Sequence, residues 1–251
     1  MSTGDRSSSF PHFLDFPLSM RVAYSLTLLT LAVGYLFAMI HTFSSHAGRD
    51  GNPMLSVDDL IIAYSGSKQD TELEAALKGA MAAMLPQEEA ATIIAWVRSD
   101  PSRAQFDEVI MPIFEQRCLR CHDGSNPHIP ELTNFAKTMQ TVQLDTGMDV
   151  FTLVRVSHIH LFGLTFIFFL VTMIFVHAHL RPAWIKCTII AIPFLAILAD
   201  ILSWYLTKIF APFAWVVLIS GALMGISFLA MVLISVYQMW LYKPAAKPVV
   251  D

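Results

Sequence analysis

The sequence is poor in charged residues and in cysteine, and it contains no basic run and no low-complexity tract. Charged residues make up 14% of its 251 residues and hydrophobic residues 55%, whereas a soluble domain carries about 25% charged residues. Three cysteines are too few for a disulfide-stabilised scaffold. The missing basic and repetitive segments argue against nucleic-acid-binding, collagen-like and disordered proteins. The composition is that of a membrane protein.

Long apolar segments account for this composition. Four of them are long enough to cross a bilayer as a helix, which takes roughly 20 residues. They run from Val22 to about Thr42, from about Val150 to before Arg181, from about Ile185 to Thr207, and between Lys208 and Lys243. We therefore expect four transmembrane helices.

The first apolar segment is also compatible with a cleavable signal peptide, because Ser45-His46-Ala47 is an acceptable cleavage site. The apolar core of a signal peptide is only about 7–15 residues long, however, and this segment is longer. We expect it to be retained as a membrane anchor.

Basic residues at the ends of these segments predict the orientation of the chain. The richer side carries Arg6, Arg21, Arg181, Lys186, Lys243 and Lys247, and the other side carries Arg155 and Lys208. Because basic residues concentrate on the cytoplasmic side, we expect both termini to be cytoplasmic. The segment between the first two spans then faces the periplasm of a bacterial inner membrane.

Three parts are expected. Residues 1–43 form a cytoplasmic tail and the first span, residues 44–149 a periplasmic domain, and residues 150–251 a three-helix membrane region with a cytoplasmic tail. The periplasmic part has eight Lys and Arg against sixteen Asp and Glu, a net charge of −8 in a chain whose total is −4. The exported domain is therefore acidic.

Local signals predict that the exported domain is helical. A helix is expected over residues 57–64 after Ser56, a second opens with the capping box Thr71-x-x-Glu74, and a third begins at Pro86. No alternating strand pattern occurs. The expected fold class is all-α, a four-helix transmembrane bundle with a helical, cytochrome c-like domain inserted between the first and second spans.

Two further helices are expected nearer the second span. A short one covers residues 135–142, and a longer one runs from about Ala104 to Arg117. Four apolar residues of the longer helix fall on one stripe, which is typical of a helix packed on a core; they are Phe106, Ile110, Ile113 and Phe114.

Directly after that helix stands Cys118-Leu119-Arg120-Cys121-His122, the signature of covalent c-type haem attachment. Two thiols separated by two residues can form thioethers with both vinyl groups of a haem, and the adjacent imidazole can turn under the ring to bind the iron. The alternatives are a chance match and a zinc or redox CxxC. The amphipathic helix before the motif and its exported position favour haem.

The segment from Phe106 to His122 resembles the first helix and haem site of a monohaem cytochrome c. Such proteins continue well past the motif to a methionine ligand and a packing helix, whereas here the membrane region resumes at about Val150. Helices between Val57 and Val97 would therefore cover the haem. The order of one anchor, a CxxCH domain and three further spans beginning Ser157-His158-Ile159-His160-Leu161-Phe162-Gly163 is similar to uncharacterised four-span membrane cytochromes of Gram-negative bacteria.

The sixth ligand of such a haem iron has three candidates, Met148, Met139 and His128. His128 follows His122 by six residues, a reach of roughly 20 Å that barely clears the ring edge. Met148 follows a glycine that can form a turn and lies near the membrane, so we rank it first and Met139 second. Both methionines are alternatively core residues.

Histidines in the spans are the remaining candidates for cofactor binding. His41, His158, His160 and Asp200 lie in the predicted outer part of the membrane, where ionisable groups are commonly functional. They predict either one b-type haem or a metal ion, or else a cluster that only pairs polar groups at helix ends. On the inner side, a second b-type haem would need His12, and we expect His177 and His179 at headgroup level instead.

These observations predict a membrane-bound cytochrome with one covalent haem c that transfers single electrons at the periplasmic face. It would act as an electron carrier or as an oxidoreductase subunit of a respiratory complex. The expected donor is a quinol and the expected acceptor a soluble periplasmic cytochrome or an oxidase of the respiratory chain. A haem-based redox or gas sensor is the alternative.

Overall fold

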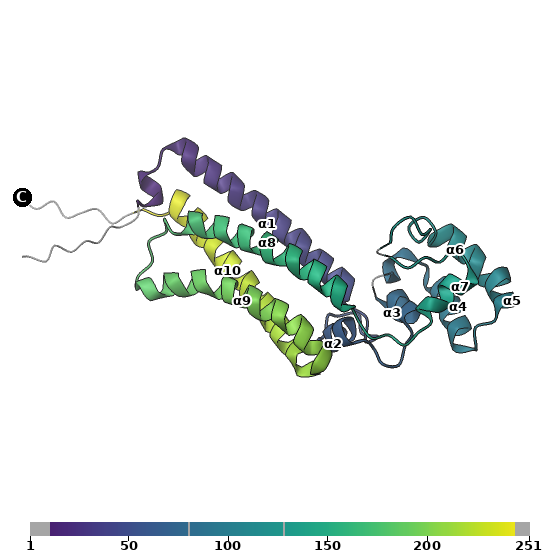
Figure 1. Ribbon diagram of the computed structural model, residues 1–251. Helices are drawn as coiled ribbons and strands as arrows, with labels where there is room; N and C mark the ends of the chain where they lie inside the picture. Colours follow the sequence, from purple (N-terminus) through teal and green to yellow (C-terminus); the bar gives the residue numbers. More distant parts are fainter. Residues whose placement is uncertain (1–10, 80, 128, 244–251) are drawn as a thin grey trace, which may run out of the picture. The chain divides into compact units, whose positions relative to one another are not determined.

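The computed structural model describes residues 11–79, 81–127 and 129–243, and the regular elements of these residues are helices (Figure 1). One isolated antiparallel bridge joins Thr71 and Leu144. The all-α expectation is confirmed for this part of the chain. The chain divides into two compact units.

Four of the described helices are long and apolar enough to cross a membrane. They are α1 (Leu18–His46), α8 (Val150–Phe175), α9 (Ala183–Ile209) and α10 (Ala214–Trp240). The shortest has 26 residues, and at 1.5 Å per residue it spans about 39 Å, more than the hydrocarbon core of a bilayer. The four predicted spans are confirmed, and the chain is a multi-pass membrane protein.

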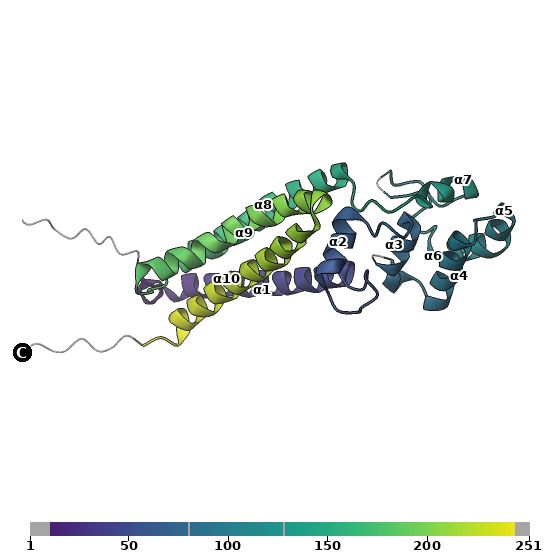
Figure 2. The same cartoon turned by 90° about the horizontal axis from the view of Figure 1, so that it is seen from below.

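The first unit, here called the membrane unit, consists of the chain up to Met39, Val154–Ser203, and the chain from Val216 onward. Its long helices run alongside one another in both views (Figures 1 and 2). Phe168, Phe175 and Met231 are fully buried in it, and the ring of Phe168 meets that of Phe228 edge-on at 6.1 Å. Many large apolar side chains on the same helices are exposed, as expected for surfaces that face lipid.

The second unit, here called the motif unit, consists of Ile40–Leu153 and Trp204–Trp215. Its helices are α2 (Val57–Ser65), α3 (Glu72–Lys78), η2 (Ala82–Met84), α4 (Gln87–Arg98), α5 (Arg103–Gln105), the π-helical η3 (Phe106–Ile110), α6 (Met111–Arg117), α7 (Phe135–Thr138), η4 (Met139–Thr141) and η5 (Ala211–Phe213). The predicted helix starts at Ser56, Thr71 and Pro86 are confirmed. At both Ser56 and Thr71 the reciprocal hydrogen bonds of a capping box are present.

The helix predicted over residues 104–117 is instead three consecutive helical segments. Its middle segment, η3, has a π-type turn, in which the Met111 backbone N–H donates to the Phe106 carbonyl. Pro112 follows at the start of α6, and proline cannot donate the hydrogen bond that an uninterrupted α-helix requires. The wider turn accommodates this missing donor.

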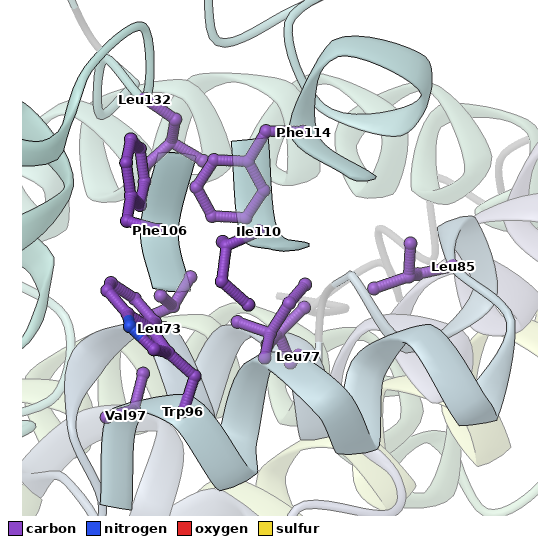
Figure 3. Packing of buried hydrophobic residues seen from close by; sticks show 10 residues of the cluster. Leu73, Leu77, Leu85, Trp96, Val97, Phe106, Ile110, Phe114 and Leu132 are labelled. Atoms are coloured by element: carbon purple, nitrogen blue, oxygen red, sulfur yellow. The ribbon is translucent and has the colours of Figure 1, made fainter. Parts of the chain in front are cut away.

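The core of the motif unit lies between α3, α4, η3 and α6 (Figure 3). Phe106, Ile110 and Phe114 from the predicted stripe are at most 1% exposed, and the fourth member, Ile113, is partly buried against them. Trp96 closes the cluster from α4, with its ring 5.6 Å from that of Phe106. The stripe prediction is confirmed, and it fixes the helix that ends at the CxxCH motif.

Candidate functional site

The CxxCH motif forms one further turn at the end of α6. The Cys118 N–H donates to the Phe114 carbonyl at 2.8 Å, and the Cys118 carbonyl accepts from the N–H groups of Cys121 and His122 at 3.0 and 2.9 Å. Phe114 is fully buried in the core. The motif is therefore anchored to the packed end of α6 and folded into a compact turn.

The two cysteines of the motif differ in burial. Cys118 is half-buried against the core cluster and Cys121 is exposed. Both are free thiols in this structure. Burial, followed by the negative charge of Glu89, raises the pKa of the Cys118 thiol. Two thiols are thus available on one turn, with one facing the core and one facing outward.

The imidazole of His122 is held by the chain that follows it. Its Nδ1 lies 2.7 Å from the Pro130 carbonyl oxygen, and its own carbonyl accepts from the Leu132 N–H at 3.0 Å. Because a carbonyl oxygen only accepts hydrogen bonds, Nδ1 must carry the proton. The lone pair of the neutral ring is then on Nε2, the atom that a metal would bind.

These residues fit a covalently attached haem. A c-type haem requires two thiols two residues apart, an imidazole with an available nitrogen, and an apolar surface for the ring. The motif supplies the first two; the core cluster is itself buried, and the apolar side chains that are partly buried against it include Leu119 and Met139.

The structure separates the two methionine candidates. Met139 begins η4 and packs against the core cluster, as Cys118 does. Met148 lies in the loop before α8, where its N–H donates to the Ala63 carbonyl at 3.0 Å and its carbonyl accepts from Lys208 at 2.7 Å. Met139 and the motif therefore share one core, while the Met148 backbone is fixed to the end of α2. His128 lies outside the described residues.

The membrane histidines occupy exposed positions. His41, on α1, is exposed. On α8, His158 lies edge-on to Phe162 at 5.1 Å, and Nδ1 of His160 is 2.9 Å from the carbonyl of Val156 in its own helix. Asp200, by contrast, is buried in α9. Within residues 11–79, 81–127 and 129–243, no group of three or more His, Cys, Asp or Glu side chains is arranged to hold a metal ion.

The sequence did not predict the burial of His12, which was considered there only as a ligand of a second b-type haem. His12 is 7% exposed; its Nδ1 accepts from the Leu14 N–H at 3.2 Å, and its Nε2 lies 3.1 Å from Oε1 of Gln238. Gln238 also pairs with both backbone groups of His179. The only signal in the sequence is the spacing of His12 and Asp15, which form a capping box.

The sequence also did not predict the contacts of Lys208, which belongs to the motif unit. Lys208, in the last turn of α9, donates to the backbone carbonyls of Tyr64, Thr146 and Met148 at 2.8, 3.0 and 2.7 Å. All three protons of the ammonium group are thereby used. The sequence indicates only a basic residue at a helix end, because backbone carbonyls leave no mark on the pattern of side chains.

Comparison with known proteins bears on the membrane region alone. A family model described as a transmembrane helical domain matches residues 145–246. The matched stretch contains α8, α9 and α10 and does not include the CxxCH motif. Neither the curated proteins nor the solved structures contain a significant match.

Proposed function

We propose that this protein is a membrane-bound c-type cytochrome that transfers single electrons at the periplasmic face of a bacterial inner membrane. In this proposal, Cys118 and Cys121 hold one haem through thioether bonds, and Nε2 of His122 is the proximal iron ligand. The observation that carries the proposal is the 2.7 Å contact between His122 Nδ1 and the Pro130 carbonyl.

This contact supports metal binding because histidine ligands almost always donate their second ring N–H to a carbonyl or a carboxylate. Such a partner fixes the tautomer and the orientation of the ring. The partner of His122 is the carbonyl of Pro130, eight residues later in the chain, and this contact would orient the imidazole as the role of proximal ligand requires.

The bound haem would supply a one-electron redox couple, and the protein determines its surroundings. Cys118 and Cys121 would hold this group covalently, and of their two thiols the first is half-buried against the core and the second is exposed. Phe114 and Leu132 exclude water behind the motif. The net charge of −8 in residues 44–149 favours encounters with a basic partner.

For the sixth ligand, the contacts favour Met139 over Met148. Met139 shares the core with Cys118, and a thioether ligand raises the haem potential relative to a second imidazole. A quinol remains our proposed donor and a soluble cytochrome or an oxidase our proposed acceptor. The alternative, a haem-based sensor, requires an open sixth site and therefore predicts carbon monoxide binding without displacement of a methionine.

Covalent attachment is tested by expressing the chain with a c-type maturation system and staining a denaturing gel for haem. Replacing both Cys118 and Cys121 with Ala should remove the stain completely. Cys187 is exposed and lies outside the motif, so Cys187→Ala is the matched control and should keep the full signal. A stained band that persists in the double variant would refute the attachment site.

A further inference from the structure

An arginine of α1 stacks on a tryptophan of α10 within the membrane unit. The guanidinium carbon of Arg21 lies 4.5 Å from the centre of the Trp240 ring. The indole is itself held in place, because Trp240 Nε1 donates to the Ser25 hydroxyl at 2.8 Å and that hydroxyl donates to the Arg21 carbonyl at 2.9 Å. The charged group of Arg21 therefore rests on a fixed aromatic surface.

Both residues lie at the ends of their helices. Arg21 follows the first residue of α1, Leu18, by three positions, and Trp240 is the last residue of α10. α1 has 29 residues, about 43 Å at 1.5 Å per residue, whereas the hydrocarbon core of a bilayer is about 30 Å thick. The end turns of α1 therefore extend to the level of the lipid headgroups, where tryptophan is enriched in membrane proteins.

Arg21 forms no ion pair with any of the residues that the structure describes. Its Nε is buried and has no hydrogen-bonding partner there. Acidic residues are scarce in the described part of the membrane unit, which contains Asp15 and Asp200. A buried donor without an acceptor in the protein indicates an acceptor from outside it, such as a water molecule or an anion.

Large apolar side chains flank the stacked pair in the sequence. Leu18 and Val22 on α1 and Leu241 after α10 are all exposed, Leu18 to 65% and Leu241 to 68%. At the end of a membrane helix, such side chains contact acyl chains. A ligand that suits both the guanidinium and these side chains combines an anionic group with acyl chains.

Further basic residues gather at the same end of the membrane unit. The connection between α8 and α9 is joined to α10 there, because Gln238 in the last turn of α10 pairs with both backbone groups of His179. Arg181 and Lys186 lie at this connection, and Lys243 follows α10. Basic residues next to a membrane helix attract anionic lipids.

An arginine can bind a phosphate through two parallel N–H donors while its plane stacks on an aromatic ring. We propose that Arg21 binds the phosphate of an anionic phospholipid at this end of the membrane unit. Trp240 is the positioning residue, because it orients the guanidinium and its own indole is fixed by Ser25. The site does not depend on haem.

Thermal unfolding of the full-length protein in detergent micelles tests the proposal, because a ligand of the folded state raises the unfolding midpoint. Phosphatidylglycerol should raise the midpoint more than phosphatidylcholine does, since choline offsets the phosphate charge. Inorganic phosphate at the same concentration should leave it unchanged. An equal rise with inorganic phosphate would show a site for free anions, and equal effects of the two lipids would show no preference for anionic lipid; either result would overturn the proposal.

Variants assign the lipid effect to Arg21. Arg21→Gln should abolish the difference between the two lipids, whereas Arg181→Gln removes the same charge from an exposed arginine at that end and should keep it. Arg21→Lys keeps the charge without the planar group, and Trp240→Leu removes the aromatic surface, so both should shift the phosphatidylglycerol titration to higher lipid concentration. A full lipid difference in Arg21→Gln, or an unshifted titration in Arg21→Lys, would contradict the proposal.

Discussion

At the scale of single residues, the backbone decides which histidine nitrogen is available. Nδ1 of His122 faces a carbonyl and must be the donor, whereas Nδ1 of His12 faces a backbone N–H and must be the acceptor. The proton of His12 is consequently on Nε2, where it is donated to Gln238. Both nitrogens of His12 are thus engaged, which argues against the b-type haem that the sequence left open there. The tautomer of His122 leaves a lone pair on Nε2, the atom through which an imidazole could bind iron.

A prediction at the residue scale concerns Met139 and Met148, the two candidates for the sixth ligand of the haem iron. If Met139 is the sixth ligand, Met139→Ala should remove the thioether-to-ferric-iron absorption band and lower the midpoint potential of the haem, because it removes a ligand that favours reduced iron. Met148→Ala is the matched variant and should retain the band, since the Met148 contacts to Ala63 and Lys208 are made by its backbone. The opposite pattern in the spectra would identify Met148 as the ligand.

At the scale of helices, ion pairs join the beginning of α3 to the end of α4. Arg98 contacts Glu74 at 2.6 Å and Asp70 at 3.2 Å, and Lys78 contacts Asp70 at 2.7 Å. Burial tends to raise the pKa of Glu74, but hydrogen bonds from Thr71 and Arg98 outweigh it and lower that pKa below its ordinary value of 4.5. Glu74 therefore prefers to be ionised in the folded unit.

This preference predicts acid sensitivity of the motif unit. A lowered pKa in the folded state stabilises the fold above the unfolded-state value of 4.5, and this contribution disappears as the pH falls through the folded-state value. Fluorescence of buried Trp96 should report unfolding at acid pH. Glu74→Gln should be less stable at neutral pH and lose less stability between neutral pH and about pH 3.

Glu115 is an exposed carboxylate on α6, so Glu115→Gln serves as the control and should follow the unmodified protein. An equal acid response in Glu74→Gln and the unmodified protein would mean that this carboxylate does not set the pH dependence.

Helix caps and apolar stripes were predicted well, because both depend on residues that lie near one another in the sequence. The caps at Ser56 and Thr71 and the stripe from Phe106 to Phe114 are of this kind. Contacts between distant backbone segments were not predictable. Gly147 has a φ of +72°, and a Cβ there would lie 2.4 Å from the Tyr64 carbonyl oxygen. The glycine turn was expected, but neither this close approach nor its link to Lys208 can be derived from sequence spacing.

The same limit applies to the candidate site. Cys118, Cys121 and His122 were identified from their spacing, which carries the chemistry. The Pro130 contact and the difference between Met139 and Met148 required the folded chain, because each depends on which loop returns to the core.

At the scale of the whole molecule, charge is distributed unevenly along the sequence. Residues 44–149 carry −8 while the chain as a whole carries −4, so the remaining residues are net basic. The basic residues at the ends of the four membrane helices predict that this acidic segment is exported and that both termini stay in the cytoplasm.

Topology reporters test this orientation. A reporter that is active only in the cytoplasm should be active when fused after Lys243 and silent when placed near Gly124. Activity at Gly124 together with silence after Lys243 would invert the orientation, and it would place the CxxCH motif on the side where c-type haem is not attached.

The most direct test of the central claim is a pyridine haemochrome measurement on the purified full-length protein, which counts c-type and b-type haem separately. If the CxxCH turn and His122 are the attachment site, the protein should contain one c-type haem per chain. A protein matured in a competent host that contains no c-type haem would contradict the account.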